Sequence, residues 1–483
     1  MVEEKDLTIM KYIRTYETEE KFLTDKDSAS RGFRLKPTLY KYSEAGDHVH
    51  LELDDPRKHD GSTYMEITLD SDVEFSFYIG NKPGDTQTTM NCSIDWSDGT
   101  VETKTITKDD KGFKLSHNYK AGSYKIELYD VERSYCTVGG YESWGEYTSP
   151  ISHPSSIKRL VLGSNFIIGY RSFGGCTSLA SVYIPEGITS IGEGAFHRCD
   201  SLTSVYIPES VTSIGPGAFY YCTSIKSIYI PKSVTSIEYG AFSGCSSLTS
   251  INIPEGVTSI TGFDNCTSLT SVYIPESATS IEEDAFQGCT SLTLVHIPES
   301  VTSIGRGAFY YCTSLKSINI PKGVTSIGNQ VFGKCTSLTS FYIPENITSI
   351  GYRAFFGCTS LTSINIPDSV TSIGEQAFME CTTLTSVHIP ESVTSIGDSV
   401  FNGCTSLTSI NIPEGVTSIE NGTFYNCYSL TSISSLNTTA PTLGNKVFYK
   451  LPTNGTLHVK PGATGYDAWL SKLPSGWTIV EDL

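Results

Sequence analysis

The sequence predicts a solenoid of short parallel β-strands, preceded by a small antiparallel β-sandwich. Two observations lead to this prediction. Twelve of the 14 cysteines recur at a nearly constant interval, and the residues between them repeat with little change. A constant period of about 20 to 50 residues is typical of solenoids, in which each coil buries its apolar side chains by stacking on its neighbours. Ahead of this region, apolar and polar residues alternate over short segments, as they do in half-buried strands.

Composition and charge exclude several classes of protein. The chain has 483 residues, of which 38% are hydrophobic and 18% charged, so it can form a core. Its formal net charge of -18 repels nucleic-acid phosphates and anionic lipids, so we expect no nucleic-acid partner. No apolar run is long enough for a transmembrane helix, so we expect no membrane insertion. Residues 1–6 are neither basic nor apolar, and we expect no signal peptide in this sequence.

Residues 1–60 are predicted to form an attachment segment. They are polar and of mixed charge, with a short helix predicted at residues 15–22 and a strand at residues 49–53. The segment resembles the opening of phage virion proteins. That resemblance implies that the segment anchors the chain to a particle.

Residues 61–136 are predicted to form the sandwich. Alternating strands are predicted at residues 64–69 and 73–77. The motifs Ile-Asp-Trp-Ser-Asp-Gly-Thr, at residues 94–100, and His-Asn-Tyr-Lys-Ala-Gly-Ser-Tyr, at residues 117–124, follow them. Both motifs resemble those of the PKD-type immunoglobulin-like β-sandwich.

Three polar residues of these motifs, Asp95, Asp98 and His117, have side chains that could bind a metal ion. Ser97 departs from the PKD-type pattern, which usually has Gly at this place. Asp95 and Asp98 have the chemistry of calcium ligands, but Asp98 followed by Gly is more typical of a turn, so no metal site is predicted. His117 is predicted to be a packed strand residue, because no second His or Cys lies at a ligand spacing from it.

The cysteines define a unit of 23 residues, with a single shorter interval of 21 between Cys245 and Cys266. They are Cys176, Cys199, Cys222, Cys245, Cys266, Cys289, Cys312, Cys335, Cys358, Cys381, Cys404 and Cys427. Residues 202–207 show the pattern of one short strand, in which Val205 faces inward and Tyr206 outward. The two missing residues fall at 259–264, on the back of the coil, so we expect the sheet to continue past them.

The repeated cysteines are predicted to be buried free thiols. Equivalent side chains in stacked coils lie about 4.8 Å apart, farther than the roughly 3.8 Å between the Cβ atoms of a disulfide. No Cys-x-x-Cys pair offers a zinc site. We expect a serine at these positions to find no hydrogen-bond partner. Cys92 and Cys136 are not part of the repeat. For these two residues, a disulfide between them and two free thiols both remain open as alternatives.

The unit Leu-x-x-Val-x-Ile-Pro-x-x-Val-x-x-Ile-x-x-x-Ala-Phe-x-x-Cys resembles the BspA-type (Treponema-type) leucine-rich repeat. The resemblance covers about residues 157–434 and implies a right-handed leucine-rich repeat solenoid with a parallel sheet on one face. It also implies surface adhesion and recognition rather than catalysis. We place the solenoid at residues 137–434 and a C-terminal cap at residues 435–483, where Trp469 and Trp477 are expected to cover the last coil. The cap resembles the closing segment of BspA-like proteins.

No motif for catalysis or for a cofactor is present. The patterns His-Glu-x-x-His, Gly-x-x-x-x-Gly-Lys-Ser/Thr and Gly-x-Ser-x-Gly are all missing, so we predict no enzyme, no cofactor and no metal site. The turn after each Ile-Pro pair carries an acid in nine of eleven units and a lysine in the other two, Lys232 and Lys322. We interpret this acidic ridge as a solvated surface.

The candidate binding residues occupy one outward strand position that varies while the frame around it does not. They are Tyr183, Tyr206, Tyr229, Asn252, Tyr273, His296, Asn319, Tyr342, Asn365, His388 and Asn411. We call these eleven residues the stripe. Two interpretations of the stripe stay open: it recognises a ligand, or its aromatic residues stack along a solvated sheet. The leading hypothesis is an extracellular or cell-surface adhesion protein that binds a host or bacterial surface protein or glycan. The alternative is a structural virion protein, such as a phage tail or head decoration.

Overall fold

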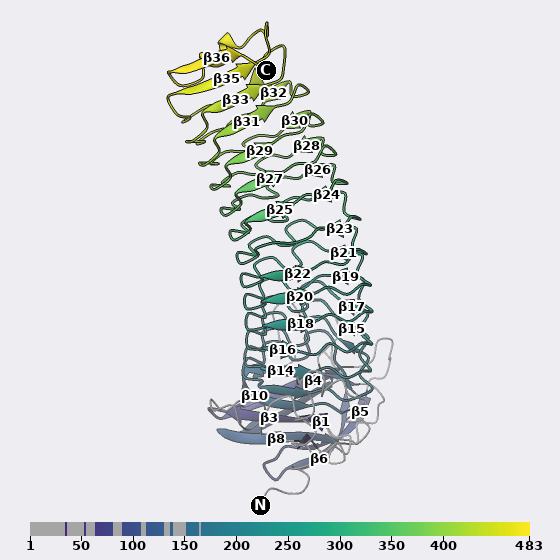
Figure 1. Ribbon diagram of the computed structural model, residues 1–483. Coiled ribbons are helices and arrows are strands. Elements are labelled where there is room, and N and C mark those ends of the chain that lie inside the picture. Colours follow the sequence, from purple (N-terminus) through teal and green to yellow (C-terminus); the bar gives the residue numbers. More distant parts are fainter. Residues whose placement is uncertain are drawn as a thin grey trace, which may run out of the picture.

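The computed structural model has a β-sandwich near the N-terminus and a curved solenoid that runs from it to the C-terminus (Figure 1). The fold class predicted from the sequence is therefore confirmed. The structure describes residues 34–35, 53–54, 63–80, 89–107, 113–129, 136–138, 151–163 and 166–483. Of the predicted attachment segment it describes only β1 (Arg34–Leu35) and β2 (Leu53–Asp54), which pair antiparallel. The helix predicted at residues 15–22 lies outside the described residues.

The sandwich consists of two sheets whose inward side chains form its core. One sheet contains β3 (Thr63–Leu69), β8 (Gly122–Tyr129), β5 (Thr89–Asp95) and β6 (Val101–Thr107). The other contains β9 (Cys136–Val138), β4 (Val73–Gly80) and β7 (Phe113–Tyr119). Phe75, Ile94 and Trp96 are completely buried between the sheets. Cys92 lies in the same core, but the Cys136 side chain is outside the described residues, so their pairing stays open.

Both sheets of the sandwich continue into the solenoid. The short helix η2 (Pro154–Ser156) leads into β10 (Ile157–Val161), which pairs antiparallel with β3 and parallel with β12 (Ser181–Tyr183) of the next coil. The following strand, β11 (Phe166–Ile167), pairs with β9. An uncovered first coil would expose a strand edge and its apolar interior. The sandwich therefore covers the N-terminal end of the solenoid.

The coils contribute strands to two parallel columns, except that residues 317–319, at the position of the first column, form no strand. The first column, which contains the predicted strand, comprises β12, β14 (Ser204–Tyr206), β16 (Ser227–Ile228), β18 (Ser250–Asn252), β20 (Ser271–Tyr273), β22 (Leu294–His296), β25 (Ser340–Tyr342), β27 (Ser363–Asn365), β29 (Ser386–His388), β31 (Ser409–Ile412) and β33 (Ser432–Ser435). Equivalent residues lie side by side, as Val182 and Val205 do.

The repeated Ser-Ile pairs form the second column, which was not predicted from the sequence. It comprises β13 (Ser190–Ile191), β15 (Ser213–Ile214), β17 (Ser236–Ile237), β19 (Ser259–Ile260), β21 (Ser280–Ile281), β23 (Ser303–Ile304), β24 (Ser326–Ile327), β26 (Ser349–Ile350), β28 (Ser372–Ile373), β30 (Ser395–Ile396), β32 (Ser418–Ile419) and β34 (Thr442–Leu443). These strands are only two residues long, too short for the alternation by which a strand is recognised in a sequence.

Phenylalanines stack through the interior from coil to coil. One ring per coil forms the stack, and the rings of Phe219 and Phe242 show its geometry, with centroids 5.4 Å apart and planes within 4°. The stack passes through the short coil, where Phe242 and Phe263 are 5.6 Å apart. Both rings are completely buried. The stack therefore keeps the coils in register even where one coil lacks two residues.

The cysteine ladder runs beside this stack. All twelve repeated cysteines are buried free thiols, which confirms the prediction. The expectation that a serine would find no partner at these positions is wrong. From the second coil onward each thiol donates to the phenylalanine carbonyl of the preceding coil, as Cys312 Sγ does to Phe286 O at 3.2 Å. Burial raises the pKa of the Cys312 thiol well above its ordinary value.

The first column continues past the short coil, where β18 pairs with β16 and β20, as expected. In the second column β17 and β19 belong to separate sheets. The same column also divides between β23 and β24 and between β30 and β32, where no residues are missing. The break between β17 and β19 is therefore not specific to the short coil.

The C-terminal segment adds strands to the end of the first column. β33 pairs with β35 (Gly455–Val459), which pairs with β36 (Trp477–Glu481), all parallel. Between them, α4 (Asp467–Leu470) places Trp469 against Phe448, the last ring of the stack, at 5.4 Å. The Trp469 indole N–H donates to Pro441 O at 2.9 Å. This segment therefore covers the last coil, with an aromatic ring closing the stack.

Replacing Cys312 tests the thiol hydrogen bond. Cys312→Ala removes the donor to the Phe286 carbonyl and leaves a small cavity, so we expect a loss of about 1–3 kcal/mol in unfolding free energy. Cys312→Ser keeps a donor and is expected to be more stable than the alanine variant. Chemical denaturation measures both. A serine variant less stable than the alanine variant would contradict the role of the carbonyl.

Removing the C-terminal segment should make the protein associate. Truncation after Ser434 exposes the completely buried side chains of Leu430 and Ile433 on an open coil. We expect oligomers in light scattering and a lower melting temperature. A chain that lacks only the exposed residue Leu483 is the control. A monodisperse truncated protein with an unchanged melting temperature would show that the last coil needs no cover.

Candidate recognition surface

The candidate stripe lies on the outward face of the first column. Alternation along each strand separates its inward and outward residues, so Val272 is 4% exposed while Tyr273 is 48% exposed. Pairing between coils places the stripe residues side by side, as with Asn252 and Tyr273, and with Tyr273 and His296. The structure therefore gathers the predicted residues into one column along the solenoid.

The stripe is not equally open along its length. Tyr183, Tyr206 and Tyr229, at the end near the sandwich, are half-buried. The Tyr229 hydroxyl donates to Glu209 Oε1 at 3.0 Å, and burial together with the Glu209 charge raises the pKa of Tyr229 to about 12. The stripe and the acidic ridge are therefore in contact through Tyr229 and Glu209. This contact was not predicted from the sequence.

The middle of the stripe is exposed, whereas its C-terminal end is hydrogen-bonded to the neighbouring coil. The exposed residues are Asn252, Tyr273, His296, Asn319, Tyr342, Asn365 and His388. At the far end Asn411 is half-buried, and its amide bonds to both backbone groups of Ile389, accepting from the N–H at 3.1 Å and donating to the carbonyl at 2.7 Å. The open part of the stripe therefore runs from Asn252 to His388.

A departure from the repeat lies in this open part. At the position two residues before the stripe, all units from Ser181 to Ser432 have serine except one, which has Leu294. The Leu294 side chain is 62% exposed. Beside it the rings of Tyr273 and His296 stack, 5.5 Å apart and within 12° of parallel. Leu294 was not among the predicted site residues, although its difference from the repeat is visible in the sequence.

A polar groove of about 640 Å³ opens on the second column at the short coil. Its lining includes Ser236, Glu238, Tyr239, Ser259, Thr261, Glu282, Glu283 and Asp284. Neighbouring coils are joined here by backbone bonds such as Gly217 N to Tyr239 O and Asp284 N to Arg306 O, and the short coil lacks the residues that would make the equivalent bonds. The groove is thus the space that the two missing residues would occupy.

Glu282 lines this groove at a position where two other units also have a glutamate, Glu238 and Glu420, and most units have a glycine. The equivalent residue in the next coil is Gly305, where a Cβ would lie 2.4 Å from the Glu283 backbone nitrogen of the preceding coil. Ser259 and Ser280 both donate to Glu282 Oε1 and lower the pKa of its carboxyl group. Within the part of the chain that the structure describes, no group of three His, Cys, Asp or Glu is arranged to hold a metal ion.

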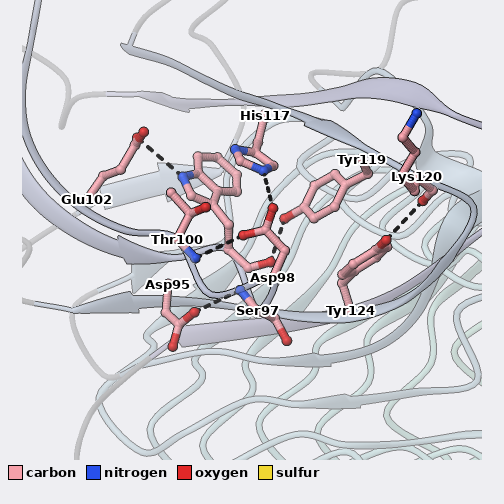
Figure 2. A network of polar contacts seen from close by, with 10 residues as sticks. Asp95, Ser97, Asp98, Thr100, Glu102, His117, Tyr119, Lys120 and Tyr124 are labelled. Atoms are coloured by element: carbon pink, nitrogen blue, oxygen red, sulfur yellow. Dashed lines mark hydrogen bonds and ion pairs between the residues drawn. The ribbon is translucent and has the colours of Figure 1, made fainter.

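The aspartates of the sandwich motif close a turn (Figure 2). Asp95 Oδ1 accepts from Ser97 N at 2.7 Å, and Asp98 Oδ1 accepts from Thr100 N at 3.0 Å. Ser97 has a φ of 66°, in the left-handed region that favours glycine. The structure therefore gives both carboxylates the turn-forming role, as predicted for Asp98.

His117 packs as predicted, but it also has a partner that sequence analysis missed. Its Nε2 lies 2.7 Å from Asp98 Oδ2 (Figure 2). Its ring stacks on Trp96, with the ring centroids 5.0 Å apart. Partial burial alone would raise the pKa of Asp98, but the hydrogen bonds from His117 and Thr100 outweigh it and hold that pKa below its ordinary value. The Tyr119 hydroxyl donates to Trp96 O at 3.0 Å, so strand β7 is tied to the turn.

Across the described residues, no helix has the length and apolar character needed to cross a membrane.

Comparison with known families matches the BspA type leucine rich repeat region to residues 153–262, 261–385 and 350–461. Because the match begins at residue 153, the PKD-type assignment of residues 61–136 stays a prediction. No curated protein matches the chain.

Several solved structures are similar to the chain. One is a leucine-rich repeat protein from Bacteroides ovatus, with 25% identity, coverage of 82% of this chain and 100% of that chain, and a TM-score of 0.63. Another is a leucine rich cell surface protein from Faecalibacterium prausnitzii, with 33% identity, coverage of 62% and 90%, and a TM-score of 0.44.

Replacing Asp98 tests the polar network of the sandwich. Asp98→Asn keeps an oxygen for the Thr100 amide but removes the charge, so His117 loses its acceptor, and we expect a loss of about 1–3 kcal/mol in unfolding free energy. The lowered pKa means that the stabilisation from the carboxylate is present above its unfolded pKa of about 4 and is lost as pH falls through the folded value. The difference in melting temperature should therefore be large at neutral pH and small in acid. Asp70→Asn, at an exposed turn, is the control, and a difference independent of pH would contradict this role.

Proposed function

The chain belongs to the BspA-type leucine-rich repeat family, and on that basis we propose that it is a non-enzymatic recognition protein that binds a protein or a glycan at a surface. BspA-type proteins are generally surface-associated. In this chain the binding residues are the exposed part of the stripe, from Asn252 to His388. The location is the cell surface or the extracellular space.

One observation supports this proposal above the others: variable side chains are exposed on a constant frame. The inward residues of the coil, such as Val272 and Ile274, are buried and nearly the same in every unit, because each packs against its equivalent. The outward position carries Tyr, His and Asn, which combine flat faces with hydrogen-bonding groups. Stacking of Tyr273 on His296 accounts for one neighbouring pair, but not for Tyr342, which is 66% exposed.

The virion alternative receives no such support. It depends on the attachment segment, of which the structure describes only residues 34–35 and 53–54. The surface-recognition proposal depends on the solenoid, which the structure describes from residue 166 to the C-terminus.

Binding should depend on the exposed tyrosines of the stripe. We expect the double change Tyr273→Ser and Tyr342→Ser to weaken binding by about 30-fold or more, because a few aromatic anchors usually dominate an interface. The fold should be kept, since both side chains point outward. The measurement is affinity for ligands identified on a glycan and mucin array and in a peptide screen.

The matched control changes two similarly exposed tyrosines outside the stripe, Tyr311→Ser and Tyr428→Ser, which are 45% and 52% exposed in the native protein. Changing Glu255 and Glu276 to Gln should alter mainly the salt dependence, because solvated charges act at long range and are screened. If the control variant loses binding and the stripe variant keeps it, the binding face is elsewhere.

A further inference from the structure

The exposed leucine of the stripe region indicates what kind of ligand this face accepts. Leu294 occupies a position at which all the other units from Ser181 to Ser432 have serine, and most of these serines are partly or fully exposed. No packing inside the coil requires it, because the side chain is 62% exposed and its pairing partner Ser271 is exposed as well. An exposed aliphatic group in place of a hydroxyl offers apolar area and no hydrogen bond.

Leu294 is part of a larger apolar surface. It and His296 are two residues apart on β22 and therefore point to the same side. His296 stacks on Tyr273 of the preceding strand, and Tyr273 is 48% exposed. We call Tyr273, Leu294 and His296 the Leu294 patch. The patch combines one aliphatic side chain with the edge of an aromatic pair, a surface that suits an apolar side chain.

Exposed carboxylates border the Leu294 patch on one side. Glu255, Glu276 and Glu299 follow β18, β20 and β22 on the acidic ridge, and all three are exposed. The next coil carries two exposed lysines, Lys316 just before the strand position and Lys322 on the ridge. The side of the patch toward Glu255 and Glu276 is thus negative, and it favours a partner with positive charges on that side of its apolar residue.

We propose that the Leu294 patch docks an apolar side chain from a basic segment of a protein partner. This inference rests on the proposed function and narrows it from protein or glycan to protein. A glycan would gain hydrogen bonds from the serine that this unit lacks, whereas an apolar side chain gains contact area from the leucine. A second copy of the chain is a poor occupant, because two acidic ridges and two charges of -18 would repel each other.

A displayed library of random peptides tests the proposal on the full-length protein. Peptides selected on the native chain should carry a Leu, Ile, Phe or Trp flanked by Lys or Arg. Their affinity should fall at least 10-fold for Leu294→Ser, and it should fall with rising salt. Because serine is the residue of the other units, this variant keeps the repeat pattern and should melt at the native temperature.

Val101→Ser is the matched control, because it also removes an exposed aliphatic side chain, 66% exposed, but from the sandwich. It should leave the affinity unchanged. The inference is overturned if the selected peptides bind Leu294→Ser as well as the native chain, or if they are acidic or lack an apolar residue. It is also overturned if light scattering shows a dimer that Leu294→Ser dissociates, or if a glycan on an array depends on Leu294.

The tyrosine variant of the previous subsection separates the two proposals. If Tyr273→Ser with Tyr342→Ser weakens peptide binding and Leu294→Ser does not, the stripe still binds, and only the docking at the Leu294 patch is wrong. If neither variant changes the binding, both proposals fail.

Discussion

The rest of the structure depends on the contact between the phenylalanines and cysteines of successive coils. Each phenylalanine ring stacks on the next, and each following thiol donates to the phenylalanine carbonyl one coil back, as Cys335 does to Phe309 O at 3.2 Å. Cysteine suits this place because it is small and apolar yet carries a weak donor. Because the partners of every coil are its own equivalents, a coil is stable only within the array, and both ends of the array need cover.

The two ends are covered in different ways. At the N-terminal end β3 of the sandwich pairs directly with β10, so the sandwich is part of the same sheet as the first coils. At the C-terminal end β35 and β36 extend the column, and Trp469 closes the phenylalanine stack. The pairing of β3 with β10 therefore sets the direction of the solenoid relative to the sandwich.

Constant inward contacts leave the outward positions free to vary, and three departures from the repeat lie in one region. The short coil, the groove with Glu282 and the exposed Leu294 all lie between Lys232 and Lys322. A change at an exposed outward position leaves the phenylalanine stack in place, because that side chain points to the opposite side of the strand. In the proposed function, recognition resides in the residues that differ from the repeat, on a scaffold built by those that do not.

The sequence alone determined the solenoid, its strand with Val205 inward and Tyr206 outward, and the buried free thiols, because a repeat places equivalent residues in contact one period apart. It also located the short coil. Only the tertiary structure decided the contacts between residues that the repeat does not relate: β3 with β10, Asp98 with His117, and Tyr229 with Glu209. Periodicity contains no information about the register of such pairs, since they depend on how separate segments pack. For the same reason only the folded chain showed which part of the stripe is open and where two missing residues leave a groove.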